Sequence, residues 1–262
     1  MGKDQTVLFH STVFGPIHSR RLGVSLGINL GPDDGKVCSF DCIYCEAGYN
    51  RQGTGTTGLP PKEKVYNDLR NKLVSMREKG ENLDVLTFSG NGEPTLHPDF
   101  PEILDDVMAL RNEFYPEAKV SVLSNSTKIF SPEIEKALKK VDNNILKLDS
   151  GVETTMRVID CPNSPDFTVK KLIEGLKKFS GNAIIQTMFL RGEHDGVKVD
   201  NTTSREIEAL IAAYREIRPK EIMIYSIDRS TPEEKLVKVE KAELAKIAEK
   251  IEKETGIPVK TA

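Results

Sequence analysis

A chain of 262 residues in which 38% are hydrophobic and 29% are charged has the composition of an ordinary globular protein. With a net charge of −3, the surface as a whole is not strongly basic, unlike that of many nucleic-acid-binding domains. RNA is therefore an open but unsupported partner. No stretch approaches the roughly 20 consecutive apolar residues of a membrane span, and the N-terminus lacks the long apolar core of a secretory signal. We therefore expect a cytoplasmic protein that does not bind a membrane.

Apolar alternation and turn residues predict strands that alternate with helices along the chain. The first strand, 24–30, ends at a Gly-Pro-Asp-Asp-Gly turn, and further strands are expected at 84–88, 119–123, 145–149, 183–189 and 221–225. Helices are expected at 60–79, 98–112, from 131 onward, 168–179, 203–217 and 241–254. The segments 48–58, 150–167 and 191–200 are expected to be loops.

Six alternating units favour a parallel sheet, because a parallel connection needs a long crossover. The pattern alone does not distinguish a closed eight-stranded barrel from an open sheet. In either arrangement the polar residues at the carboxyl ends of the strands meet at one edge. Since no repeat or low-complexity linker divides the chain, we expect one domain over 1–262, with an N-terminal extension at 1–23, a core at 24–230 and a helical segment at 231–262.

Three of the four cysteines lie close together, in the run Cys38-Ser39-Phe40-Asp41-Cys42-Ile43-Tyr44-Cys45. In a reducing compartment such thiols more often bind metal or carry out redox chemistry than form disulfides. A closed zinc site or a simple ferredoxin cluster needs four ligands, which here would require a histidine or Cys161. Three thiolates on a cubane cluster would instead leave one iron open to a small molecule.

The CxxxCxxC spacing, with an aromatic residue before the last cysteine, resembles the signature of the radical S-adenosylmethionine (SAM) enzymes. The resemblance implies a partial (β/α)6 barrel of the TIM type and a [4Fe-4S] cluster held by Cys38, Cys42 and Cys45. It further implies that SAM chelates the open iron and is cleaved to a 5′-deoxyadenosyl radical, which abstracts hydrogen from a substrate. Tyr44 would present its backbone to the adenine.

Polar residues after three of the predicted strands fit the same resemblance. The turn Gly90-Asn91-Gly92-Glu93 is similar to the Gly-Gly-Glu motif that binds the amino group of SAM, with Asn91 as a departure from the common pattern. Glycine allows close approach there, and a carboxylate faces an ammonium. Further SAM contacts are expected from Ser124, Asn125 and Asp149, although Ser, Asn and Asp also favour strand ends as turn residues.

The segments 14–23 and 224–233 are similar to a group of stand-alone radical SAM proteins of the iron-sulfur oxidoreductase type, related to the tRNA wyosine-synthesis enzymes. This resemblance implies a small-molecule or nucleoside substrate and a reducing partner such as flavodoxin or ferredoxin. Arg20 and Arg21 would bind an anion or make a structural ion pair. The sequence assigns no catalytic residue and leaves the role of Cys161 open. The alternatives are an electron carrier or maturation partner, with Cys161 or a partner as fourth ligand, and a zinc module.

Overall fold

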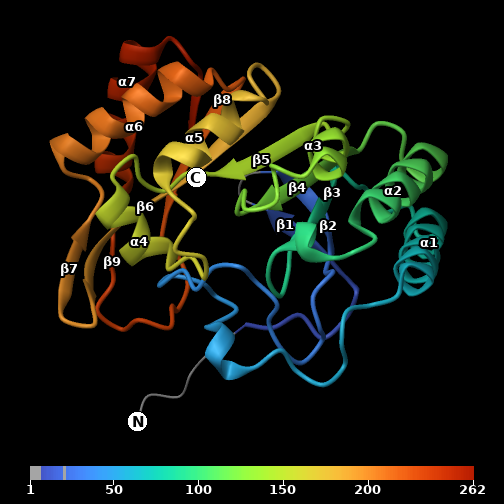
Figure 1. Cartoon of the computed structure of the whole chain (residues 1–262). Coiled ribbons are helices and arrows are strands. Elements are labelled where there is room, and N and C mark those ends of the chain that lie inside the picture. The colour runs from blue at the N-terminus through green and yellow to red at the C-terminus, as the bar shows by residue number, and fades with distance from the viewer. Residues whose placement is uncertain (1–6, 20–21) are drawn as a thin grey trace.

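The computed structural model describes residues 7–19 and 22–262, which form an open, curved sheet with helices along its outer face (Figure 1). The strand order is β1-β2-β3-β4-β5-β6-β8-β10, and β7 and β9 pair with β6. The strands from β2 to β10 along this order are parallel, and β1 is antiparallel to β2. The strand bounds are Val13–Ser19, Gly23–Ile28, Val85–Phe88, Lys119–Ser124, Asn143–Lys147, Ala183–His194, Val197–Asp200, Glu221–Ser226, Val237–Lys238 and Val259–Thr261 for β1 to β10.

The helices connect the strands and bury one apolar side against the sheet. In α1, for example, the buried residues Val65, Leu69, Leu73 and Met76 recur every three or four positions. The α-helix bounds are Lys62–Glu78, Phe100–Phe114, Pro132–Leu138, Glu153–Asp160, Val169–Lys177, Ser204–Ile217 and Lys241–Thr255 for α1 to α7. Two short 3₁₀ helices, Asn50–Gln52 and Pro94–Leu96, lie in the loops after β2 and β3.

The prediction of an α/β fold with a partial barrel is confirmed, and the sheet does not close. All four residues of β3 are buried and three of them are apolar, as expected for a strand of a parallel sheet covered on both faces. The six predicted strands correspond to β2, β3, β4, β5, β6 and β8. The six predicted helices correspond to α1, α2, α3, α5, α6 and α7.

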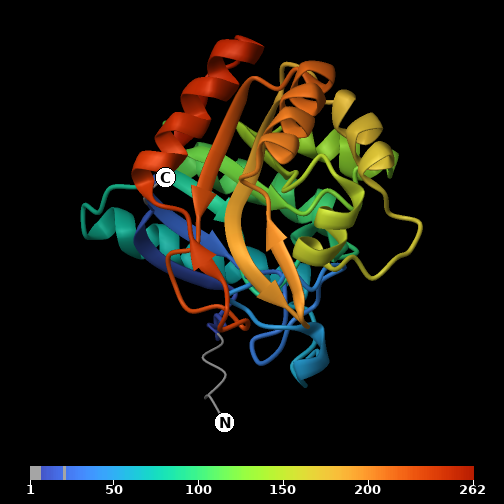
Figure 2. The ribbon, with the colours of Figure 1, turned by 90° about the vertical axis from the view of Figure 1, so that its left-hand side faces the viewer.

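Four features of the structure were not predicted. The N-terminal extension contains β1, and the segment at 231–262 contains β9 and β10 besides its helix. The loop expected at 150–167 contains α4, and the loop expected at 191–200 is the end of β6 and all of β7. Figure 2 shows β6 as the long arm of this hairpin. Its turn is Asp195-Gly196, and both residues have positive φ, which is the geometry that favours an Asp-Gly hairpin turn.

The segment 36–50 between β2 and α1, which we call the cysteine loop, crosses the end of the sheet where the parallel strands finish (Figure 1). This is the edge at which the polar residues were expected to meet. No helix among the described residues combines the length and apolar character needed to cross a membrane. Arg20 and Arg21, for which an anion site or an ion pair was predicted, lie outside the described residues.

Candidate active site

The three clustered cysteines are free thiols, each partly buried in the cysteine loop. Burial, together with the neighbouring charges of Glu93 and Cys45, raises the pKa of Cys38 to about 11 against the opposing effect of Lys36. Burial also raises the pKa of Cys42, with added repulsion from the two other cysteines of the loop. Burial and repulsion between the sulfurs thus favour the thiol forms of Cys38 and Cys42. Turning all of them into thiolates requires a positive partner, which a bound metal centre supplies.

The start of the cysteine loop is bonded to the glycine turn after β3. Val37 forms a parallel bridge with Gly92, in which the Val37 N–H donates to the Asn91 carbonyl at 3.2 Å. The Glu93 N–H donates to the Val37 carbonyl at 3.0 Å. These bonds hold Cys38, the next residue along the chain, beside Glu93. The structure thus brings together the first cysteine and the predicted SAM-binding turn.

Glu93 is buried at 6% exposure, and backbone and hydroxyl groups hold its carboxylate. One oxygen accepts hydrogen bonds from the Thr95 N–H at 3.1 Å and the Thr95 hydroxyl at 2.5 Å. The other accepts from the Asn125 N–H at 2.6 Å. Burial raises the pKa of Glu93 above its ordinary value in spite of these bonds. A cation at this carboxylate would therefore stabilise its charged form.

Asn125 connects the end of β4 with the cysteine loop. Its side-chain amide donates to the Cys38 sulfur at 3.5 Å and to the Ser39 hydroxyl at 2.9 Å. Ser124 is buried, and its hydroxyl accepts from the Ser126 N–H at 3.1 Å and contributes to holding Glu93 ionised. Both residues thus lie at the same edge as the cysteines, and Asn125 contacts a sulfur, a role that the sequence did not predict.

Asn91 and Gly90 are part of the framework around the turn. The Asn91 amide donates to the carbonyls of Phe9 and Pro32 at 2.8 and 2.7 Å and accepts from the Phe9 N–H at 2.9 Å. A Cβ at Gly90 would lie 2.4 Å from the Asn29 side-chain oxygen, which accepts from the Asn91 N–H. The Asn91 side chain therefore holds the N-terminal segment and leaves only its backbone to face the site.

Asp149 and Tyr44 belong to a buried polar group at the end of β5. The Tyr44 hydroxyl and the Lys147 ammonium both contact the same Asp149 oxygen, and the other oxygen accepts from the Met188 N–H at 2.8 Å. Lys147 also lies 3.1 Å from an Asp160 oxygen. Burial alone would lower the pKa of Lys147, but the two carboxylates outweigh it and raise that pKa well above its usual value. Both Asp149 oxygens are thus engaged, a charged pairing that the sequence did not reveal.

Helix α4, which the sequence prediction missed, supports the cysteine loop. The Ile43 N–H donates to the Ile159 carbonyl at 3.0 Å, and the Asp41 N–H donates to the Cys161 carbonyl at 3.1 Å. The Cys161 thiol itself donates to the Val158 carbonyl at 3.3 Å. Burial, together with the charges of nearby carboxylates, raises the pKa of this thiol to about 11. The apolar residues Met156 and Ile159, three positions apart on the buried side of the helix, were the available sequence signal.

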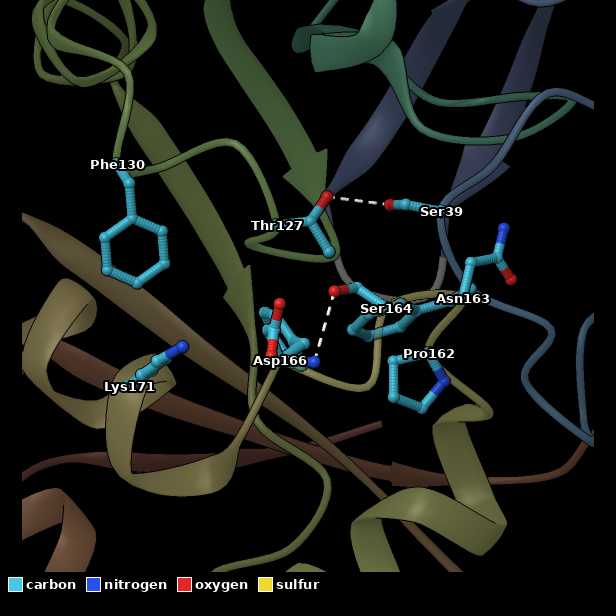
Figure 3. A pocket seen from close by; sticks show the side chains of 10 residues that line it. Ser39, Thr127, Phe130, Pro162, Asn163, Ser164, Asp166 and Lys171 are labelled. Atoms are coloured by element: carbon cyan, nitrogen blue, oxygen red, sulfur yellow. Dashed lines mark hydrogen bonds between the residues drawn. The ribbon is translucent and has the colours of Figure 1, made fainter.

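A cavity of about 510 Å³ lies beside the cysteine loop. Figure 3 shows Phe130 and Lys171 on one side of it and Ser39, Asn163 and Pro162 on the other, with Ser39 bonded to Thr127. Its lining is mainly apolar, with a few polar groups, as is usual for small-molecule pockets. A molecule bound here would touch the residue that follows Cys38. The lining residues are Ser39, Phe40, Thr127, Phe130, Pro162, Asn163, Ser164, Asp166, Phe167 and Lys171.

Within the part of the chain that the structure describes, no group of three His, Cys, Asp or Glu side chains could hold a single metal ion. The side chains present do fit a larger centre with several metal ions. The three partly buried cysteines interact electrostatically with Lys36, and the Asn125 amide donates a hydrogen bond to the Cys38 sulfur. Sulfur donors with a hydrogen-bond donor beside them suit an iron-sulfur cluster.

Comparison with known proteins agrees with this fold. The sequence model of the radical SAM superfamily matches residues 34–197, more than half of the chain. A UPF0026 protein of Helicobacter pylori is 30% identical over 221 residues, which cover 83% of this chain and 66% of that protein. The chain therefore spans just under two thirds of that relative's length.

Two solved structures share the fold at low sequence identity. A radical SAM methyltransferase from Sphaerobacter thermophilus aligns with a TM-score of 0.67 and 16% identity, covering 91% of this chain and 65% of that one. The structure of TYW1 with a lysine-pyruvate adduct bound aligns with a TM-score of 0.60 and 15% identity, covering 88% of this chain and 74% of that one. The fold and the site together define a protein of the radical SAM type. The chain belongs to the radical SAM superfamily, whose enzymes use a [4Fe-4S] cluster and SAM.

Proposed function

We propose that this chain is a radical SAM enzyme in which Cys38, Cys42 and Cys45 hold a [4Fe-4S] cluster, and Gly92 and Glu93 anchor SAM. The observation that carries the proposal is the pair of bonds between Val37 and the turn at Gly92, which join a cysteine to a buried carboxylate. When bound and reduced, the cluster supplies one electron that cleaves SAM to methionine and a 5′-deoxyadenosyl radical, which takes a hydrogen atom from the substrate.

The residues around the cysteines have separate tasks in this proposal. The buried Glu93 carboxylate accepts the SAM ammonium, a charge-assisted bond that offsets the cost of its burial. Asn125 donates to the Cys38 sulfur and positions it. The backbone of Gly90 and Asn91 shapes the turn. Cofactor chemistry supplies the radical, while the protein orients the reactants and shields them from water.

The nucleoside half of SAM is assigned to the polar residues at the ends of β4 and β5. Ser124 lies beside Glu93, and Asp149 lies with Tyr44 next to Lys147. In the structure the two Asp149 oxygens accept three bonds within the protein, so a contact with the ribose uses the remaining acceptor site or replaces one of these bonds. The Tyr44 backbone is assigned to the adenine.

The substrate in this proposal is a small metabolite or a nucleoside, tRNA nucleosides included. The electron comes from a one-electron donor of the flavodoxin or ferredoxin type. Substrate identity is a property of pocket shape and chemistry and does not follow from the fold. Screening for deuterium transfer from labelled candidates into 5′-deoxyadenosine would identify it.

The test is 5′-deoxyadenosine formation by the anaerobically reconstituted, reduced protein with SAM, beside the Cys42→Ala variant. We expect the product from the wild type and its loss in the variant. An intact, reducible cluster that gives no product and whose spin spectrum does not respond to SAM would refute the assignment.

The electron-carrier alternative needs a fourth ligand, and Cys161 is the remaining cysteine of the sequence. Its thiol donates to the Val158 carbonyl, and the main charges acting on it are carboxylates rather than the three clustered sulfurs. This arrangement gives no support to a fourth thiolate ligand from within the chain.

A further inference from the structure

Lys36 is a buried lysine inside the cysteine loop, two residues before Cys38. Its side chain is only 2% exposed. The ammonium donates to the Gly48 carbonyl at 2.7 Å and lies 3.5 Å from an Asp41 oxygen. An ammonium carries three N–H donors, so these two contacts are sparse for a charge removed from water.

The loop folds around this ammonium. The Asp41 oxygen near Lys36 also accepts the Asn50 N–H at 2.6 Å, and the Asn50 amide donates to the Cys38 carbonyl at 3.1 Å. The Gly48 N–H donates to the Cys45 carbonyl at 2.9 Å. The ammonium is therefore enclosed by the same segment that carries the three cysteines.

The contacts of the Lys36 ammonium lie next to the cysteines. Its acceptor Gly48 is bonded to Cys45, and its neighbour Asp41 directly precedes Cys42. The ammonium therefore lies among the backbone segments that carry the proposed cluster ligands. A positive charge held in a dry site interacts more strongly with nearby charges than one in water.

We propose that Lys36 is the buried counter-charge of the iron-sulfur cluster, a positioning residue that raises the reduction potential of the centre held by the three cysteines. This inference rests on the proposed function. Three thiolates bring three negative charges, and one-electron reduction adds another. A fixed cation beside them stabilises the reduced state more than the oxidised state, and net charge is one of the factors that set cluster potentials.

The same geometry predicts an opposite effect for Asp41. Its carboxylate opposes Lys36 and lies in the same loop. In Asp41→Asn the amide oxygen can still accept the Asn50 N–H, while the negative charge is removed. Lys36→Met removes the positive charge with little change of length. The two variants should therefore shift the potential in opposite directions, which a merely structural role for Lys36 does not predict.

The experiment is a redox titration of the reconstituted protein without SAM, read by optical and spin spectra, together with iron and sulfide content. The variants are Lys36→Met, Lys36→Arg and Asp41→Asn. The matched control is Lys64→Met, since Lys64 is a half-exposed lysine that pairs with Asp68 on the surface of α1. At a fixed potential we expect the ratio of reduced to oxidised cluster to fall at least tenfold in Lys36→Met, which is about 59 mV for one electron.

The ratio should rise in Asp41→Asn and stay within about threefold of the wild type in Lys36→Arg and Lys64→Met. A Lys36→Met protein with a full cluster and the potential of the Lys64→Met control overturns the proposal. If Lys36→Met takes up no cluster, the sign of the shift in Asp41→Asn decides. A wild-type chain that binds no iron overturns the proposed function as well, whereas a loaded wild type with unshifted variants overturns only the role of Lys36.

Discussion

The contact between Gly92 and Val37 makes a quantitative prediction for Gly92→Ala. Gly92 has φ of +124°, and a Cβ at this position would lie 1.8 Å from the Val37 carbonyl oxygen and 2.5 Å from its carbon. Side-chain carbons do not approach other atoms closer than 3.0 Å, so the two segments would have to separate by about 1.2 Å. Because Val37 precedes Cys38, this separation moves a proposed cluster ligand.

The expected cost has two parts. Overpacking a close contact costs about 1–3 kcal/mol, and forcing an L side chain into a left-handed conformation costs about 1–2 kcal/mol. Gly92→Ala should therefore lower the free energy of unfolding by about 2–5 kcal/mol. For a chain of this size that corresponds to a loss of about 10 °C in Tm. The cluster content after reconstitution should fall as well.

The matched control is Gly80→Ala, after the end of α1. Gly80 has φ of +66°, and a Cβ there would meet nothing within 4 Å, so this variant carries the backbone strain without the clash. Thermal unfolding of both variants, followed by circular dichroism, separates the two costs. A Gly92→Ala protein as stable as Gly80→Ala and with a full complement of iron would refute the reasoning.

Three further predictions use other parts of the structure. Cys161→Ala should keep the iron and sulfide content of the wild type, since its thiol bonds to a backbone carbonyl, and a loss of iron would restore the electron-carrier alternative. Asn91→Ala should lower the free energy of unfolding by about 3 kcal/mol, because the buried Asn91 side chain loses three hydrogen bonds, and an unchanged urea midpoint would contradict this. Hydrogen bonds from Thr56, and then from Thr57, lower the pKa of Asp34, so the carboxylate stabilises the fold above about pH 4 and this stabilisation is lost as the pH falls. Tm measured from pH 7 to pH 2 should fall less steeply for Asp34→Asn than for the wild type, and parallel profiles would count against the assignment.

The core of the fold could be predicted from the sequence because the central strands are buried on both faces. Runs such as the one in β3 are apolar apart from the buried Thr87 and are followed by polar turns, so their position is fixed locally. The last strand of the sheet, β10, has only three residues, and its parallel partner β8 lies more than thirty residues earlier. Nothing local in such a short segment specifies the pairing, which depends on how α7 returns the chain to the sheet.

The prediction missed α4 and the β6–β7 hairpin near the site. Their sequence signals were too short, and both segments were interpreted as loops. Helix α4 has eight residues, fewer than the length at which helical periodicity becomes reliable. The β6–β7 hairpin had the Asp195-Gly196 turn as its signal. The run Thr203-Ser204-Arg205-Glu206 has the sequence pattern of a capping box, but only half of it forms. Thr203 caps α6, whereas the Glu206 side chain accepts from Ser150 instead of its own helix end. Buried polar pairing of this kind depends on distant segments and cannot be read from one helix.

The position of Asn91 explains why this chain departs from the Gly-Gly-Glu pattern without giving up the geometry of the turn. Its side chain is bonded to Phe9 and Pro32, on either side of β1 and β2, while its carbonyl accepts the Val37 N–H. One residue therefore ties the N-terminal segment, the end of β2 and the start of the cysteine loop to the turn. The glycine that the close approach requires is Gly92, whose missing side chain makes room for the Val37 carbonyl. Asn91 thus adds stabilising hydrogen bonds at a position of the turn whose side chain points away from the proposed SAM site.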